Sequence, residues 1–207
     1  MRLPGKTLSV LFSMLILAAP AAGTDECFIV GNIEAEVNGD NPEMGMWVYT
    51  LTVSWNTGTP YALSHFNMIL DVEFGECTCT DFANALNWAE PAGSSTGYDS
   101  YGEPCNAEYF LYLECGGDPS VPDVDAPLLK FEPDEFADCE PGPVGEGTFV
   151  FYSDYPPAPV ADYESFLVDK HSNLACFGTL TGVFPGLPCD PVGAQDYSWG
   201  SLKSSYR

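Results

Sequence analysis

WVYTLTVSW, residues 47–55, is the stretch that decides the fold class. Large apolar side chains at the odd positions alternate with mostly polar side chains at the even positions. This period of two is typical of a strand that buries one face. The aromatic and β-branched residues that fill the stretch are also enriched in strands. The stretch therefore predicts a β-strand with one face in an apolar core.

Similar strand patterns recur along the whole chain. They lie at residues 27–37, 66–72, 109–113, 128–132, 149–152, 163–168 and 175–181. Segments rich in Gly, Pro, Ser and Asp separate them, and no segment has a helical apolar stripe over three turns. About eight strands separated by such turn segments predict an all-β fold, specifically an antiparallel β-sandwich.

Three of the connecting segments are long, at residues 90–104, 116–127 and 133–147. Loops of this length are uncommon in compact domains unless they are functional or held in place. Cysteines lie in or beside all three, so we expect disulfides to hold these loops. The loops would then form the variable face of the sandwich.

The first twenty-three residues have the layout of an export signal. Arg2 and Lys6 precede an apolar run at residues 8–19, and the small residues 21–23 follow it. This pattern predicts a secretory signal peptide, with an apolar run too short for a comfortable bilayer span. We expect a single sandwich domain at residues 24–189 and a flexible tail at 190–207. The protein is thus predicted to be secreted, extracellular or at the cell surface, with no membrane span.

The chain is strongly acidic, with 30 Asp and Glu against 6 Lys and Arg and a net charge of −24. Such a surface repels phosphate backbones and anionic lipids, which argues against nucleic-acid or membrane partners. The acidity favours either a solvated surface or the binding of calcium, an ion that prefers oxygen ligands.

All eight cysteines follow the predicted signal. They are Cys27, Cys77, Cys79, Cys105, Cys115, Cys139, Cys176 and Cys189. In an oxidising compartment, an even number of cysteines indicates disulfides. A zinc site would need paired C-x-x-C motifs, which the chain lacks. Cys77 and Cys79 are too close to bridge each other easily. We favour bonds from these two to members of the group Cys105, Cys115 and Cys139, with a local bridge between Cys176 and Cys189.

The segment YALSHFNMILDVEFGECTC, residues 61–79, resembles a module of exported bacterial proteins. In that module a Leu-Ser-His step precedes an apolar strand and a cysteine-bearing loop. Residues 95–97, 128–131 and 149–189 follow in the same order. The resemblance implies an extracellular β-sandwich without a particular activity. The chain's last nine residues are similar to the tails of other exported proteins, which leaves a sorting tag or a frayed terminus open.

Catalytic signals are sparse. Nucleophilic catalysis would have to use His65 or His171, the only histidines, and no G-x-S-x-G elbow is present. Ser64 and His65 are neighbours on a predicted strand edge, so their side chains should point to opposite faces. A hydrolase could instead use paired carboxylates, but the sequence cannot select a pair from thirty.

Two sets of loop residues are candidates for binding. Trp88, Tyr98 and Tyr101 lie in loop-like sequence, where exposed rings could stack on sugars. Asp118, Asp123 and Asp125 could supply oxygen ligands to calcium, although neither this loop nor residues 134–140 have EF-hand spacing.

The sequence thus predicts a secreted, non-catalytic protein for extracellular recognition or surface structure. The alternatives are a carbohydrate-binding module and an extracellular carboxylate-dependent hydrolase. We expect no cofactor other than possible calcium, and a glycan or a protein as ligand. The ligand, the disulfide connectivity and the oligomeric state stay open at this point.

Overall fold

The computed structural model describes residues 26–70, 77–121, 124–160 and 167–189. The predicted signal peptide and the predicted tail lie outside these residues. The elements are β1 (Phe28–Val37), η1 (Pro42–Met44), β2 (Trp47–Asn56), β3 (His65–Ile69), α1 (Cys79–Ala85), β4 (Gly93–Tyr98), β5 (Pro104–Glu114), β6 (Leu128–Pro133), β7 (Glu140–Pro141), β8 (Val144–Ser153), β9 (Pro157–Pro159), β10 (Leu167–His171) and β11 (Leu174–Pro185).

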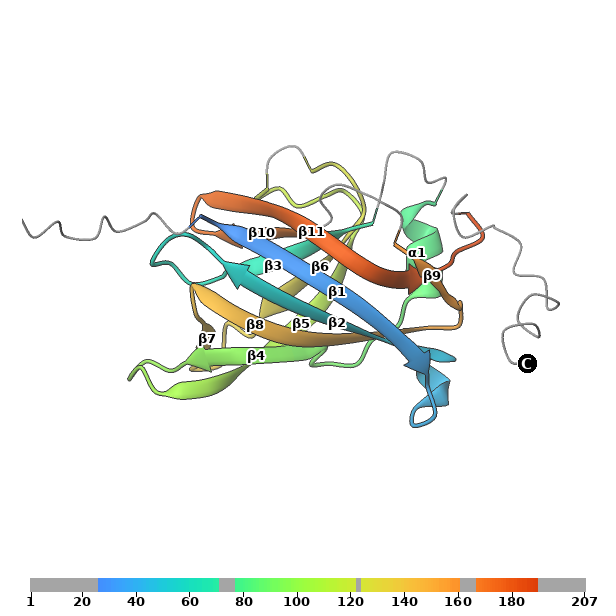
Figure 1. Cartoon of the computed structure of the whole chain (residues 1–207), viewed down its shortest axis with the longest axis horizontal. Helices are drawn as coiled ribbons and strands as arrows, with labels where there is room; N and C mark the ends of the chain where they lie inside the picture. Colours follow the sequence, from blue (N-terminus) through green and yellow to red (C-terminus); the bar gives the residue numbers. More distant parts are fainter. Residues whose placement is uncertain (1–25, 71–76, 122–123, 161–166, 190–207) are drawn as a thin grey trace, which may run out of the picture.

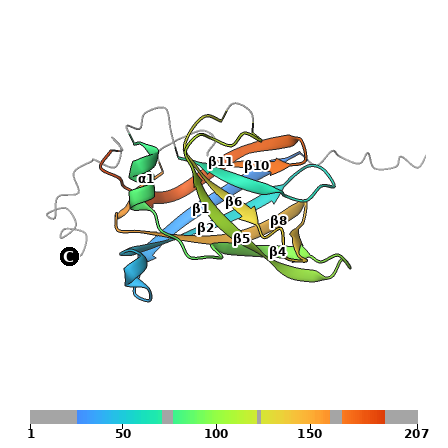
Figure 2. The same cartoon turned by 180° about the vertical axis from the view of Figure 1, so that it is seen from behind.

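Nine strands form one closed barrel (Figures 1 and 2). The hydrogen-bonded order is β1-β2-β8-β4-β5-β6-β3-β10-β11, and β11 pairs with β1 to close the ring. The closing pair is parallel, whereas the other neighbouring strands are antiparallel. The short strands β7 and β9 extend the sheet beside β4 and β11.

The predicted β-sandwich is therefore wrong, although the all-β class is correct. Strands of a sandwich and of a filled barrel both alternate between a buried and an exposed face, so local periodicity does not separate the two. The difference lies in one pairing, between residues 30–33 and residues 179–182. No local pattern encodes the pairing of segments so far apart in the chain.

Glycine makes the closing pair possible. Gly182 on β11 lies opposite Ile33 on β1 and has φ of +99°. A Cβ at position 182 would lie 2.0 Å from the Ile33 carbonyl oxygen. Only a residue without a side chain fits this conformation and this close approach.

Aromatic side chains fill the barrel. Phe66 stacks on Phe131 with ring centroids 4.5 Å apart, and its edge contact with Phe149 has centroids 4.8 Å apart. Tyr109 makes an edge contact with Phe149 at 5.0 Å, and its hydroxyl hydrogen-bonds Ser95 at 3.1 Å. The rings thus bury apolar area while the one polar atom in the group keeps a partner.

A short helix, α1, lies against one end of the barrel (Figure 2). Thr78 and Asp81 form a capping box at its start, and Phe82 and Ala85 are buried. The sequence does not predict this helix, because two turns are too short for a recognisable apolar stripe. Two disulfides, Cys77–Cys189 and Cys79–Cys115, hold the start of the helix in place.

Four disulfides join distant parts of the barrel. They are Cys27–Cys176, Cys77–Cys189, Cys79–Cys115 and Cys105–Cys139. The prediction of four disulfides is confirmed. The favoured connectivity is correct for Cys79–Cys115 only, because closure of the barrel brings Cys27 to Cys176 and leaves Cys189 beside Cys77.

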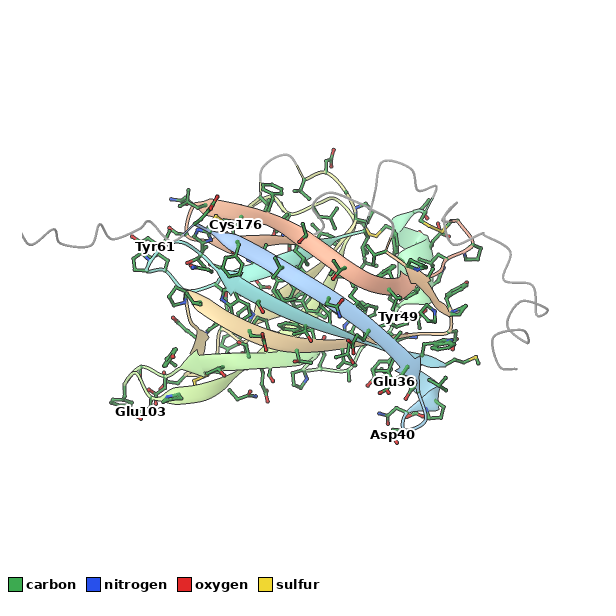
Figure 3. All side chains as sticks on the ribbon, in the orientation of Figure 1. Glu36, Asp40, Tyr49, Tyr61, Glu103 and Cys176 are labelled. Carbon is green, nitrogen blue, oxygen red and sulfur yellow. A yellow bond between two sulfur atoms is a disulfide. The ribbon has the colours of Figure 1, made fainter. Side chains whose placement is uncertain are left out.

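Because neighbouring strands are antiparallel, each connection lies at one of the two ends of the barrel. Residues 57–64, 99–103, 134–143 and 172–173 gather at one end, which we call the loop end; Tyr61 and Glu103 mark it in Figure 3. At the opposite end, near α1, β5 ends and β6 begins. The expected loop 90–104 instead contains the barrel strand β4, and residues 133–147 contain β7 and the start of β8. The three long segments therefore do not form one variable face.

Candidate ligand-binding end of the barrel

A cavity of about 320 Å³ opens at the loop end. It is lined by Ala62, Leu63, Ser64, Pro133, Asp134, Glu135, Ala137, Cys139, Glu140 and Pro141. One wall is the connection between β2 and β3, and the other is the connection between β6 and β8. Both walls are loops carried by barrel strands, which is where binding residues commonly occur on a rigid scaffold.

The wall at residues 57–64 is fixed by a buried threonine. The Thr57 hydroxyl contacts the carbonyl oxygens of Thr59 and Tyr61, each at 3.1 Å. The Ser64 amide donates to the Lys170 carbonyl on β10 at 2.8 Å. These bonds hold the turn, so that Leu63 is buried while Tyr61 projects outward.

The wall at residues 133–141 is fixed by turn hydrogen bonds and a disulfide. Asp134 accepts a bond from the Phe136 amide at 2.9 Å, and Cys139 is bonded to Cys105 at the start of β5. The Asp138 carboxylate accepts two bonds from Ser100, from its amide and its hydroxyl, each at 3.0 Å. The last contact connects this wall to the β4–β5 hairpin.

Four exposed aromatic residues lie at the loop end, in or beside the segments that line the cavity, and none of them is itself a lining residue. Phe136 is fully exposed, Tyr101 is 87% exposed, Tyr61 58% and Tyr98 50%. Tyr98 lies directly across the β4–β7 pair from Glu140, a cavity residue. Exposed apolar surface beside a hollow is a common feature of binding sites, which makes this end of the barrel the candidate site.

The predicted aromatic set is divided between the two ends. Tyr98 and Tyr101 lie at the loop end, but Trp88 is half-buried after α1 and donates to Glu90 at 3.1 Å. Tyr61 and Phe136 are additional binding candidates that were not predicted from the sequence. The available signal was that each is a large aromatic residue inside a turn segment, GTPY and DEFAD.

The two described members of the predicted calcium set differ in their surroundings. Asp118 is buried and hydrogen-bonded to protein groups, whereas Asp125 is exposed. Asp123 lies outside the described residues. Within the described ranges, no group of three or more His, Cys, Asp or Glu side chains is arranged to hold a metal ion.

His65 belongs to a buried cluster on the outer face of β3. Its Nε2 lies 2.7 Å from Asp118 Oδ2 and 3.4 Å from the Ser120 hydroxyl. Asn67 donates to the same Asp118 oxygen at 3.0 Å. In a catalytic triad the acid and the nucleophile bind opposite nitrogens of the histidine, whereas here both contact Nε2. The geometry therefore suits a contact that fastens residues 118–121 to the barrel wall.

The pKa values in this cluster reflect burial and its charges. Burial lowers the pKa of His65, and Lys130 nearby lowers it further against the opposing effect of Asp118. Burial alone would raise the pKa of Asp118, but hydrogen bonds from Asn67 and Ser120 and the charge of His65 outweigh it and lower the pKa. The favoured pair is a neutral imidazole and a carboxylate.

His171 is the second candidate base and lies buried near the loop end. Its Nδ1 is 3.0 Å from Asp169 Oδ1, which also accepts the Cys176 amide at 3.0 Å. Burial raises the pKa of Asp169. The pair links β10 to the residue that carries the Cys27–Cys176 disulfide.

The fold and the site define a closed, disulfide-bonded β-barrel with a hollow and exposed aromatic residues at one end. No family model, curated protein or solved structure matches the chain. Among the described residues, no helix has the length and apolarity needed to cross a bilayer.

Proposed function

We propose that the protein is secreted and acts without catalysis, in the recognition of an extracellular ligand at the loop end. The observation that carries this proposal is a cavity at the same end of the barrel as the exposed aromatic residues Tyr61, Tyr98, Tyr101 and Phe136. Aromatic residues contribute large contact areas at little cost in conformational entropy, and they dominate many binding surfaces. The predicted export signal and the four disulfides support a place outside the cell.

The surroundings of both histidines support a non-catalytic role. His65 and His171 are 6% and 1% exposed, and each is hydrogen-bonded to a buried aspartate. Neither therefore offers a free base to a substrate in solution. The alternative of a carboxylate-dependent hydrolase would have to use acidic residues of the loop end, and turnover of a polymer by the wild-type protein would favour it.

Arrays of glycans and of synthetic peptides, probed with the oxidised protein, test the recognition proposal. We expect a class of probe that binds the wild type and binds the variant Y98A/Y101A/F136A at least tenfold more weakly. The matched control is V37A/M46A, which removes exposed apolar side chains at the opposite end. Equal binding by all three proteins, or no binding to either array, would contradict a recognition role for the loop end.

A further inference from the structure

We propose that the cavity at the loop end takes the side chain of a lysine or arginine from an extracellular peptide or protein. The inference rests on the proposed recognition function and names the chemistry of its ligand. It draws on the hydrogen-bonding capacity of the cavity lining, the shape of its apolar part and the distribution of charge around it.

The polar side chains that line the cavity are almost entirely hydrogen-bond acceptors. Asp134, Glu135 and Glu140 present carboxylates, Ser64 presents one hydroxyl, and the other lining side chains are apolar. An ionised carboxylate only accepts hydrogen bonds, whereas ammonium and guanidinium groups only donate them. A neutral sugar presents hydroxyls that both donate and accept, and it would find few donor side chains here. The lining therefore matches a cationic group better than a neutral glycan.

The apolar part of the site suits the rest of such a side chain. Ala62, Pro133 and Ala137 supply accessible apolar lining beside the carboxylates. The methylene stem of lysine or arginine packs on apolar surface while its head stays at polar groups. Exposed rings such as Tyr98, across from Glu140, and Phe136, between two lining residues, can add cation–π contacts.

Within the described ranges, no lysine or arginine neutralises this site. The only Lys or Arg residues in the described ranges are Lys130 and Lys170. Lys130 pairs with Glu132 at 3.1 Å, and the Lys170 ammonium donates to the Ser172 carbonyl. Neither lines the cavity. With a net charge of −24, the whole chain also attracts a cationic partner over distance.

Isothermal titration of the oxidised protein tests this inference with defined probes. They are acetyl-Gly-Gly-Arg-Gly-Gly-amide, its lysine version, its neutral citrulline version and the neutral glycan chitotetraose. We expect both cationic peptides to bind, and the citrulline peptide to bind at least tenfold more weakly. E135Q/E140Q should weaken arginine-peptide binding at least tenfold with an unchanged melting temperature, since both side chains are exposed.

The matched control is E36Q/D40N, which removes the same charge at the opposite end of the barrel (Figure 3). It should change binding less than twofold. An equal loss in both variants would mean attraction by net charge alone and would overturn the cavity assignment. Binding of chitotetraose that is lost in Y98A/Y101A/F136A but kept in E135Q/E140Q would overturn the cationic ligand and leave the recognition function standing. If no probe binds the wild type, the cationic assignment fails; the array experiment then decides the recognition function separately.

Discussion

Asp118 and His65 meet with 2.7 Å between Oδ2 and Nε2, although 53 residues separate them and both are buried. His65 is on the outer face of β3, a face that solvent would normally reach. Asp118 covers it from the segment that follows the Cys79–Cys115 disulfide. β3 is buried on both faces along most of its length, and its neighbour β10 is buried throughout.

The first prediction concerns the loss of this contact. Asp118→Ala would leave His65 and Asn67 with buried donors that have lost their acceptor, so we expect the free energy of unfolding to fall by about 3 kcal/mol. Asp125→Ala, at an exposed position of the same segment, should change it by less than about 0.5 kcal/mol. Guanidinium unfolding followed by tryptophan fluorescence measures both. Equal effects would show that Asp118 does not fasten the segment.

The second prediction is a pH dependence with a definite sign. Because the pKa of His65 is lowered on folding, the unfolded chain binds a proton at pH values where the folded protein does not. This contribution to stability is complete above about pH 6.5, the ordinary histidine value, and is lost as the pH falls below it. We expect wild type to lose more stability than His65→Gln between pH 7.5 and 5.5 in urea unfolding. The titration of surface carboxylates is common to both proteins and cancels in the comparison, so parallel curves would contradict the prediction.

The third prediction compares two phenylalanines. Phe66 is fully buried and contacts Phe131, Phe149 and Tyr109, whereas Phe136 is fully exposed. Phe66→Ala should destabilise the barrel by about 4 kcal/mol, through lost burial and the cavity left behind. Phe136→Ala should leave stability within about 0.5 kcal/mol of wild type. A similar midpoint of denaturation for the two variants would mean that the aromatic cluster is not the core.

The strands were predictable where alternation is strong, as at residues 47–55, because one buried face imposes a period of two. β4 was missed because its sequence, GSSTGY, consists largely of residues that favour turns. The glycines of β4 are needed because the backbone of a neighbouring strand lies close to them in the assembled sheet. A Cβ at Gly93 would lie 2.4 Å from the Thr148 carbonyl oxygen of the neighbouring strand.

The candidate site was predictable only in part, because it too depends on contacts between segments that are distant in the sequence. Tyr98 and Tyr101 were recognisable as loop aromatics from sequence alone. The contact between Ser100 and Asp138 joins their hairpin to the segment that carries Phe136, and the order of strands around the barrel places Tyr61 at the same end. Local sequence records which side chains are available, whereas non-local pairing decides which of them meet.

The last prediction tests the closure of the barrel itself. Gly182→Ala would place a Cβ 2.0 Å from the Ile33 carbonyl oxygen and force a side chain into a backbone conformation with φ of +99°. Backbone atoms would have to move, so we expect a loss of at least about 2 kcal/mol and faster amide exchange along β1 and β11. Gly39→Ala is the control, because a Cβ there meets nothing within 4 Å and its φ is not in the positive range. Hydrogen exchange measured by mass spectrometry on both variants locates the effect. Unchanged protection of residues 30–33 and 179–182 in the Gly182 variant would mean that β1 and β11 do not form the closing pair.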